Sequence, residues 1–229
     1  PYLTSTWVDH AAVLLDMGLP GEQEGHGLVD VLLGVVPPSG KLPHTMPNVD
    51  NEVKMTPSQY PGDPPEASPP PCTFVPANNS RFQPCSPTKA HYSERLQVGY
   101  RWYEANSVTP AFCFGHGLTL TTFSFSDLRI IGRNVSARVL NSGSTFGVEV
   151  VQLYVRFPPS AGEPFRQLRG FERVLLSPGE SAHVSFSLTD RWLSKWSVDK
   201  AEWQLEKGEH AISVGSSLCD PRLEGKMDV

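Results

Sequence analysis

The sequence predicts a short α/β segment at the start of the chain, an all-β sandwich at its end, and a long irregular stretch between them. Three observations lead to this prediction. The first part combines a continuous apolar run with apolar residues at helical spacing. The middle is rich in proline, which forbids regular structure. The last part alternates apolar and polar side chains in short segments that are separated by turn residues.

The composition narrows the classes of protein to which the chain could belong. Its 229 residues include 22 prolines and 19 glycines, so loops are abundant and a helical bundle or coiled coil is excluded. No apolar run approaches the ~18 residues that a membrane-spanning helix needs, so no membrane partner is expected. The formal net charge is -5 at pH 7 without a block of basic residues, which argues against nucleic acid as the main partner.

Residues 1–47 have the pattern of an α/β fold. The continuous apolar run at 11–15 is typical of a buried parallel strand. Residues 22–33 have apolar side chains at helical spacing, and Gly34 is the expected stop. Residues 41–47 should be extended, because each proline disfavours helix at the residue before it. Two strands and one helix cannot form a core of their own, so this segment is interpreted as the tail of a larger α/β sandwich domain.

Residues 48–122 form a Pro-rich insertion followed by an aromatic linker. A stretch this long without regular structure is unusual in a compact domain, and is either functional or an insertion. Its second half is rich in aromatic rings, which at this density usually pack onto something. The rings are Tyr92, Tyr100, Trp102, Tyr103, Phe112 and Phe114.

Residues 123–229 are predicted to be all-β. Apolar and polar residues alternate in short segments, and turn sequences such as Asn141-Ser142-Gly143 and Ser177-Pro178-Gly179 lie between them. The clearest strands are at 123–128, 135–139, 148–155, 174–176, 182–188 and 211–214. About seven short strands with this spacing indicate a β-sandwich of the immunoglobulin or fibronectin type III kind.

A series of motifs in register along the chain resembles family 3 glycoside hydrolases, the β-glucosidase and β-xylosidase type enzymes. The motifs are GLPGEQEG at 18–25, DVLLG at 30–34, PSGKLP at 38–43, VGYRWYEA at 98–105, FGHGL at 114–118, EVVQLYV at 149–155, LRGFERV at 168–174 and VGSS at 214–217. In that family they correspond to the end of the α/β sandwich domain, a linker and a fibronectin III-like domain. Two departures are local: the insertion at 62–89 is longer than expected, and Cys219 stands where arginine is more usual.

The resemblance implies a function for the chain within a larger enzyme. A retaining glycosidase uses two carboxyl groups about 5 Å apart. In the family these are an Asp in an N-terminal barrel and a Glu earlier in the α/β domain, both upstream of Pro1. We therefore expect a C-terminal portion of a secreted, extracellular β-glucosidase-type enzyme that acts on β-linked oligosaccharides such as those of β-glucan and cellobiose.

Further expectations follow from that resemblance. This portion should contain no catalytic residue, require no cofactor or metal, be inactive alone, and pack on upstream domains to support the active site. Glucosidase and xylosidase activity are not separated. The alternative is a non-catalytic carbohydrate- or protein-binding fibronectin III-like module.

Several local residues are candidates for chemistry, and each has a simpler interpretation. Glu22 and Glu24 could form a carboxylate pair, but acidic residues in the first turn of a helix are favoured by its dipole. His26 and His44 could contact a sugar, but are more simply surface or loop histidines. With His10 they have no spacing suited to a metal.

The aromatic residues have two interpretations as well. Tyr100, Trp102 and Tyr103 could form a platform on which a sugar stacks, although packing between domains is favoured. Arg101 is expected to anchor a carboxylate or carbonyl group. Trp192 falls in the sandwich, and Trp196 and Trp203 are expected in its core or on a face that packs against upstream domains.

The four cysteines and two sequons complete the predicted sites. Cys72 and Cys85 enclose a short Pro-rich loop, and a disulfide there would contribute about 3 kcal/mol by the loop-entropy estimate. Cys113 is interpreted as a buried thiol, and Cys219 as unpaired. Asn78 and Asn134 begin Asn-x-Ser sequons and are candidate glycosylation sites, which favours an exported protein.

Overall fold

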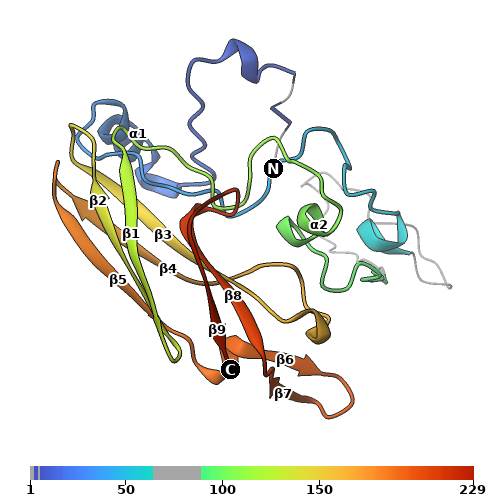
Figure 1. Cartoon of the computed structure of the whole chain (residues 1–229). Helices are drawn as coiled ribbons and strands as arrows, with labels where there is room; N and C mark the ends of the chain where they lie inside the picture. Colours follow the sequence, from blue (N-terminus) through green and yellow to red (C-terminus); the bar gives the residue numbers. More distant parts are fainter. Residues whose placement is uncertain (1–2, 5, 64–88) are drawn as a thin grey trace.

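The structure is a computed structural model that describes residues 3–4, 6–63 and 89–229. Cys72, Cys85 and Asn78 lie outside the described residues. Within them, two antiparallel sheets pack face to face in the C-terminal part (Figure 1). One sheet has the order β1-β2-β5 and the other the order β4-β3-β8-β9, and β6 and β7 form a separate hairpin. The strands are β1 (Phe123–Ile131), β2 (Asn134–Asn141), β3 (Gly147–Arg156), β4 (Gln167–Leu176), β5 (Ser181–Ser187), β6 (Ser194–Ser197), β7 (Glu202–Leu205), β8 (Glu209–Ser217) and β9 (Asp220–Asp228).

The predicted all-β sandwich is therefore confirmed, and each clear alternating segment lies in a strand. The hairpin strands β6 and β7 and the last strand β9 were not predicted. β9 contains Pro221 and Gly225 and many charged residues, so its alternation is weak in the sequence. It forms because it pairs along most of β8, with Met227 opposite His210.

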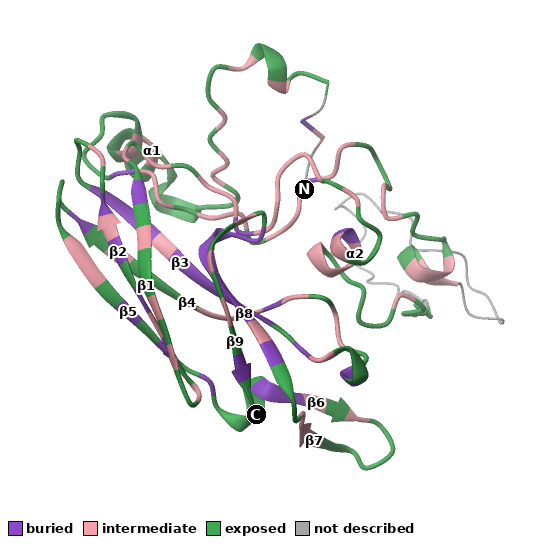
Figure 2. Ribbon diagram, viewed as in Figure 1, coloured by how far each residue is buried: buried purple, intermediate pink, exposed green. Residues whose placement is uncertain are grey.

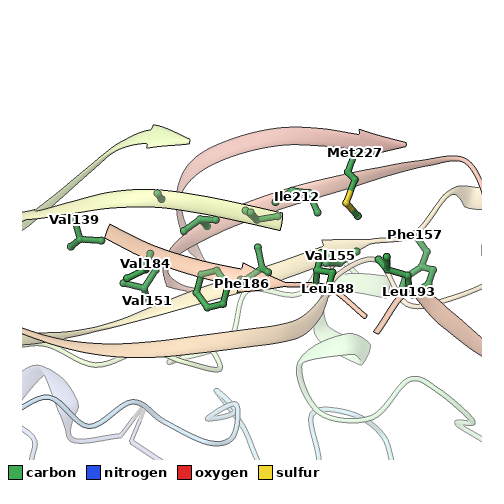
Figure 3. Packing of buried hydrophobic residues seen from close by; sticks show 14 of the residues in the cluster. Val139, Val151, Val155, Phe157, Val184, Phe186, Leu188, Leu193, Ile212 and Met227 are labelled. Atoms are coloured by element: carbon green, nitrogen blue, oxygen red, sulfur yellow. The ribbon is translucent and has the colours of Figure 1, made fainter. Parts of the chain in front are cut away.

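The core lies between the two sheets. Valines at the centre of the strands are fully buried, as strict alternation requires of residues that point toward the facing sheet. Figure 3 shows Val139 of β2, Val184 of β5 and Val151 of β3 meeting there, with Ile212 of β8 further along. Burial of one such side chain stabilises the fold by about 1.5–3 kcal/mol.

β3 differs from the other strands because both of its faces are buried (Figure 2). Val151, Leu153 and Val155 face the core, whereas Gln152 and Tyr154 face outward and are still almost fully buried. The aromatic linker contacts this outer face, since Gln152 Nε2 donates a hydrogen bond to the Gly115 carbonyl oxygen at 3.0 Å. It also contacts β4, whose Leu168 amide donates a hydrogen bond to the Tyr100 hydroxyl on α2 at 3.2 Å. The prediction that the linker rings pack is confirmed for Tyr100, Phe114 and Tyr103, but it is wrong for Tyr92, which is 77% exposed.

The N-terminal part contains short helices but no sheet among its described residues. The helical elements are η1 (Val8–His10), η2 (Gly21–Gln23) and α1 (Glu24–Leu32) before the insertion, η3 (Ser58–Gly62) and α2 (Tyr100–Ala105) around it, and η4 (Pro159–Ala161) and η5 (Asp190–Leu193) in the sandwich. α1 confirms the predicted helix. The extended 41–47 segment is also confirmed, with an isolated bridge between Met46 and Phe112.

The predicted buried strand at 11–15 is wrong for this structure. Those residues have no regular structure, and Val13 is 83% exposed. A parallel strand needs neighbouring strands to pair its backbone and cover its apolar side chains, and the described residues supply none. Leu32 at the end of α1 and Leu33 at its C-cap are exposed to solvent in the same way. No helix in the described part of the chain is long and apolar enough to cross a membrane.

Candidate functional site

One cavity in the described residues lies where the linker meets the sandwich. Its volume is about 410 Å³. α2 and the loop after it form one wall, and the β3–β4 loop and the β8–β9 turn form the other. Tyr100 stacks on Phe114 here with ring centroids 4.6 Å apart. The cavity therefore belongs to the junction between two parts of the chain, and this junction is the candidate site.

A buried ion pair links α2 to the β3–β4 loop. Arg166 Nε donates a hydrogen bond to Glu104 Oε1 at 2.6 Å, and the Glu104 side chain is 10% exposed. Glu104 Oε2 is buried without a hydrogen-bond partner among the described residues. Burial raises the pKa of the Glu104 carboxyl group, and the opposing effect of Arg166 is smaller. The pair holds the linker on the sandwich. Glu104 Oε2, which is buried without a hydrogen-bond partner in the described part of the chain, lowers the stability of the fold.

A second buried ion pair connects the extended N-terminal segment to β3. Lys41 Nζ lies 2.9 Å from Glu149 Oε1 and also donates a hydrogen bond to the Gly117 carbonyl oxygen at 3.0 Å. The Ser216 hydroxyl of β8 donates to Glu149 Oε2 at 3.0 Å. Both charges are thus compensated, and three separate segments meet at one carboxylate.

A neutral hydrogen-bond network on the outer face of β3 completes the junction. The Tyr154 hydroxyl donates to Gln152 Oε1 at 2.6 Å. Gln152 Nε2 donates to the carbonyl oxygens of Gly115 and Ser216 at 3.0 and 2.7 Å. Gly115 has a φ of +77°, and a Cβ there would overlap the Gln152 side chain. The linker turn can approach the sheet this closely only because the residue is glycine.

A disulfide also joins the linker to the sandwich. Cys113 pairs with Cys219 in the β8–β9 turn, with a Cα–Cα distance of 6.1 Å and a sequence separation of 106. The interpretation of Cys113 as a buried thiol and of Cys219 as unpaired is therefore wrong. A sequence separation this large hides the pairing, which depends on the fold that brings the two turns together.

The structure does not bring the local catalytic candidates together at the junction. Glu22, Glu24 and His26 are exposed on η2 and α1, apart from the junction. His44 is partly buried, and its Nε2 has no partner in the described part. Among the described residues no group of three His, Cys, Asp or Glu side chains could hold a metal ion. The buried carboxylates at the junction, Glu104 and Glu149, are each neutralised by a cation, which suits support rather than acid–base chemistry on a sugar.

The linker aromatics favour packing over sugar binding. Tyr103 is 5% exposed, and its hydroxyl donates to Glu52 Oε2 at 2.8 Å. Trp102 contacts the edge of Tyr103, with centroids 5.3 Å apart. Arg101 lies 5.7 Å from the centroid of the Tyr100 ring and, within the described residues, forms no ion pair. Neither the carboxylate nor the carbonyl group that Arg101 was expected to anchor is found among the described residues.

The tryptophans of the sandwich are not in its core. Trp196 and Trp203 face each other across the β6–β7 hairpin and remain 48% and 45% exposed. The Arg191 guanidinium lies 3.2 Å from the centroid of Trp203, so that ring already carries a partner on one face. Trp192 is 42% exposed. Core packing was therefore the wrong expectation for Trp196 and Trp203, and their exposure leaves the second expectation, contact with other domains, as a proposal.

Two family models match the chain. The model described as the glycosyl hydrolase family 3 C-terminal domain matches residues 1–119, and the fibronectin type III-like domain matches residues 149–218. The first model covers the α1 segment and the linker, and the second covers most of β3 through β8. The junction described above thus joins the regions of both models.

Curated relatives match almost the whole chain. The probable β-glucosidase D of Aspergillus niger is 33% identical over 100% of this chain and 30% of its own length. The thermostable β-glucosidase B of Acetivibrio thermocellus is 35% identical over 97% of this chain and 28% of its own. The chain therefore spans about 30% of the length of the relatives that it matches.

Solved structures of similar proteins agree with the fold. β-Glucosidase 3B from Thermotoga neapolitana in complex with glucose has a TM-score of 0.83 and 33% identity, covering 100% of this chain and 30% of that one. DesR, a β-glucosidase from Streptomyces venezuelae, has a TM-score of 0.83 and 31% identity, covering 97% of this chain and 27% of that one.

Proposed function

Because the chain belongs to glycosyl hydrolase family 3, we propose that it works as the C-terminal portion of a β-glucosidase-type enzyme, which hydrolyses O-glycosidic bonds of β-linked glucosides and serves carbohydrate breakdown. The observation that carries the proposal is the match of the whole chain to about 30% of proteins named β-glucosidases. The choice of glucosides over xylosides follows the names of these relatives.

The chain's own role in this proposal is mechanical support. The ion pairs Lys41–Glu149 and Glu104–Arg166 and the disulfide Cys113–Cys219 hold residues before 120 on the sandwich. A module that acted alone would not need these links to an α/β tail. We propose the division 1–47, 48–122 and 123–229, in which the first part docks on the preceding domain through its exposed apolar residues. These include Val13, Leu19, Leu32 and Leu33.

Export to the extracellular space belongs to the same proposal. The Cys113–Cys219 disulfide supports it, because such bonds persist in oxidising compartments. Asn134 is exposed at the start of β2, where a glycan could extend into solvent. We propose glycosylation at Asn134 and Asn78, and a second disulfide between Cys72 and Cys85.

A domain exchange tests the proposed function. Residues 1–229 replace the matching C-terminal portion of the Thermotoga neapolitana β-glucosidase 3B, and hydrolysis of an aryl β-glucoside is measured. The truncated enzyme is the negative control. We expect the chimera to regain activity that the truncated enzyme lacks. A well-folded chimera that stays as inactive as the truncated enzyme would contradict the supporting role.

A further inference from the structure

The cavity at the junction has mainly aromatic and other apolar walls, which come from three parts of the chain. Its volume of about 410 Å³ lies within the range of small-molecule sites, which is about 300–1,000 Å³. The linker supplies one wall, the β3–β4 loop a second and the β8–β9 turn a third. The aromatic side chains that line the cavity are Tyr100, Tyr103, Phe114 and Phe165. A small molecule held there is surrounded by side chains of different elements.

Contacts within the protein hold these rings in place without a ligand. Tyr100 stacks on Phe114 with ring centroids 4.6 Å apart, and Arg156 Cζ lies 4.0 Å from the centroid of Phe165. Phe165 is nevertheless 46% exposed, so part of its ring is available to a ligand. Aromatic rings gain from stacked or edge-to-face contacts with other rings beyond the area that they bury. The walls therefore favour a planar aromatic ligand over a saturated one of the same size.

The charges at the cavity cancel each other. Among the described residues that line it, Glu104 and Arg166 are the charged ones, and they form an ion pair with each other. Arg166 Nε donates to Glu104 Oε1 at 2.6 Å, so neither charge is left to compensate an ion. A charged group brought against the apolar walls would lose its hydration without gaining a counter-charge. The ligand that fits is therefore uncharged.

Two hydroxyl groups supply the polar contacts of the cavity. Ser107 and Thr109 line it and are exposed. Within the described part of the chain, neither side-chain oxygen forms a hydrogen bond with the protein. A hydroxyl group both donates and accepts, so each can exchange a water molecule for a hydroxyl group of the ligand.

We propose that this cavity binds an uncharged, planar aromatic molecule that carries a hydroxyl group. The proposal is independent of the proposed hydrolase function, since every residue of the cavity belongs to this chain and binding needs no hydrolysis.

Equilibrium dialysis of the 229-residue chain with 2-naphthol tests the site. Two comparison ligands each change one property of the probe: 2-decalol has saturated rings, and 2-naphthoate carries a negative charge. At neutral pH we expect saturable binding of 2-naphthol to one site, and weaker binding of both comparison ligands.

Variants of the walls connect the binding to this cavity. Phe165→Ala should weaken the affinity for 2-naphthol about tenfold, because one wall loses its ring. Ser107→Ala with Thr109→Val removes both hydroxyl groups and should weaken the affinity about fivefold. Phe146→Ala is the matched control and should bind as the wild type does, because Phe146 is 45% exposed in the loop before β3 and does not line the cavity. Circular dichroism confirms that each variant is folded.

Several results would overturn the proposal. These are the absence of saturable 2-naphthol binding, equal affinity for 2-decalol or 2-naphthoate, and unchanged affinity in folded Phe165→Ala or in the folded double variant. Equal weakening by Phe165→Ala and Phe146→Ala would overturn it as well, because the ligand would then bind apart from the cavity.

Discussion

At the scale of single residues, the junction combines charges and glycines whose roles depend on partners far away in the sequence. Glu104 and Arg166 are a good example: nothing in the VGYRWYEA motif marks its glutamate as half of a buried ion pair. Gly115 and Gly117 could be recognised as turn residues from FGHGL. Their close approach to Gln152 and Gly40 could not be predicted, because it depends on how the linker crosses β3.

Removal of the Glu104 charge tests the buried ion pair. Glu104→Leu leaves Arg166 Nε without its acceptor at every pH and should lower the free energy of unfolding by about 1–3 kcal/mol. The pKa of Glu104 is raised in the folded state, so the folded state holds the proton more tightly, and the wild type loses stability relative to the variant as the pH rises through that pKa. The stability advantage of the wild type should thus be larger at pH 4 than at pH 7, as measured by urea unfolding. A difference that grows with pH would contradict the raised pKa.

The contact between the N-terminal segment and the linker can be tested at one glycine. A Cβ at Gly117 would overlap the carbonyl oxygen of Gly40, so Gly117→Ala should push the two segments apart and cost about 1–3 kcal/mol in unfolding free energy. Gly40→Ala is the neighbouring control, because a Cβ at that residue would have no other atom within 4 Å. Hydrogen exchange at the Leu42 amide, which donates to the His116 carbonyl at 2.8 Å, should accelerate only in Gly117→Ala. Equal exchange in the two variants would be evidence against the close contact.

At the scale of secondary-structure elements, alternation located the main strands of the sandwich because each has one face in the core. The β6–β7 hairpin was not predicted from the sequence, because its strands have only four residues each and its tryptophans are half exposed. The 11–15 segment shows the opposite error, a strand that was predicted where the structure has none. Its apolar run has the composition of a buried strand, yet a strand needs neighbours that the described residues do not contain.

The disulfide between two distant turns should stabilise the junction strongly. Cys113→Ser with Cys219→Ser removes a link that encloses about a hundred residues, for which loop entropy predicts a loss of about 4–5 kcal/mol. Chemical unfolding of the double variant against the wild type measures the loss. A loss of unfolding free energy below about 1 kcal/mol would show that the disulfide contributes little to the stability of the junction.

The same double variant isolates the other two cysteines. If Cys72 and Cys85 form the proposed disulfide, thiol titration of this variant under denaturing, non-reducing conditions should find no free thiol. Two free thiols would reject that pairing.

At the scale of the whole molecule, the burial of apolar side chains differs between the two ends of the chain. The sandwich buries its own core, whereas the segment around α1 leaves large apolar side chains in solvent (Figure 2). Together with the match to about 30% of the relatives' length, this distribution fits the proposal that the chain buttresses a larger enzyme. The sequence motifs were sufficient to identify this family, because several of them occur in the expected order. They did not reveal the ion pairs and the disulfide that connect the N-terminal segment and the linker to the sandwich.

The central claim is tested most directly by assaying the purified 229-residue chain with an aryl β-glucoside. The account predicts no hydrolysis above that of a heat-treated sample, because the chain spans about 30% of the length of its β-glucosidase relatives and both buried carboxylates of its junction are paired with cations. Hydrolysis that is lost on heating would contradict it, and would place an active site within these residues.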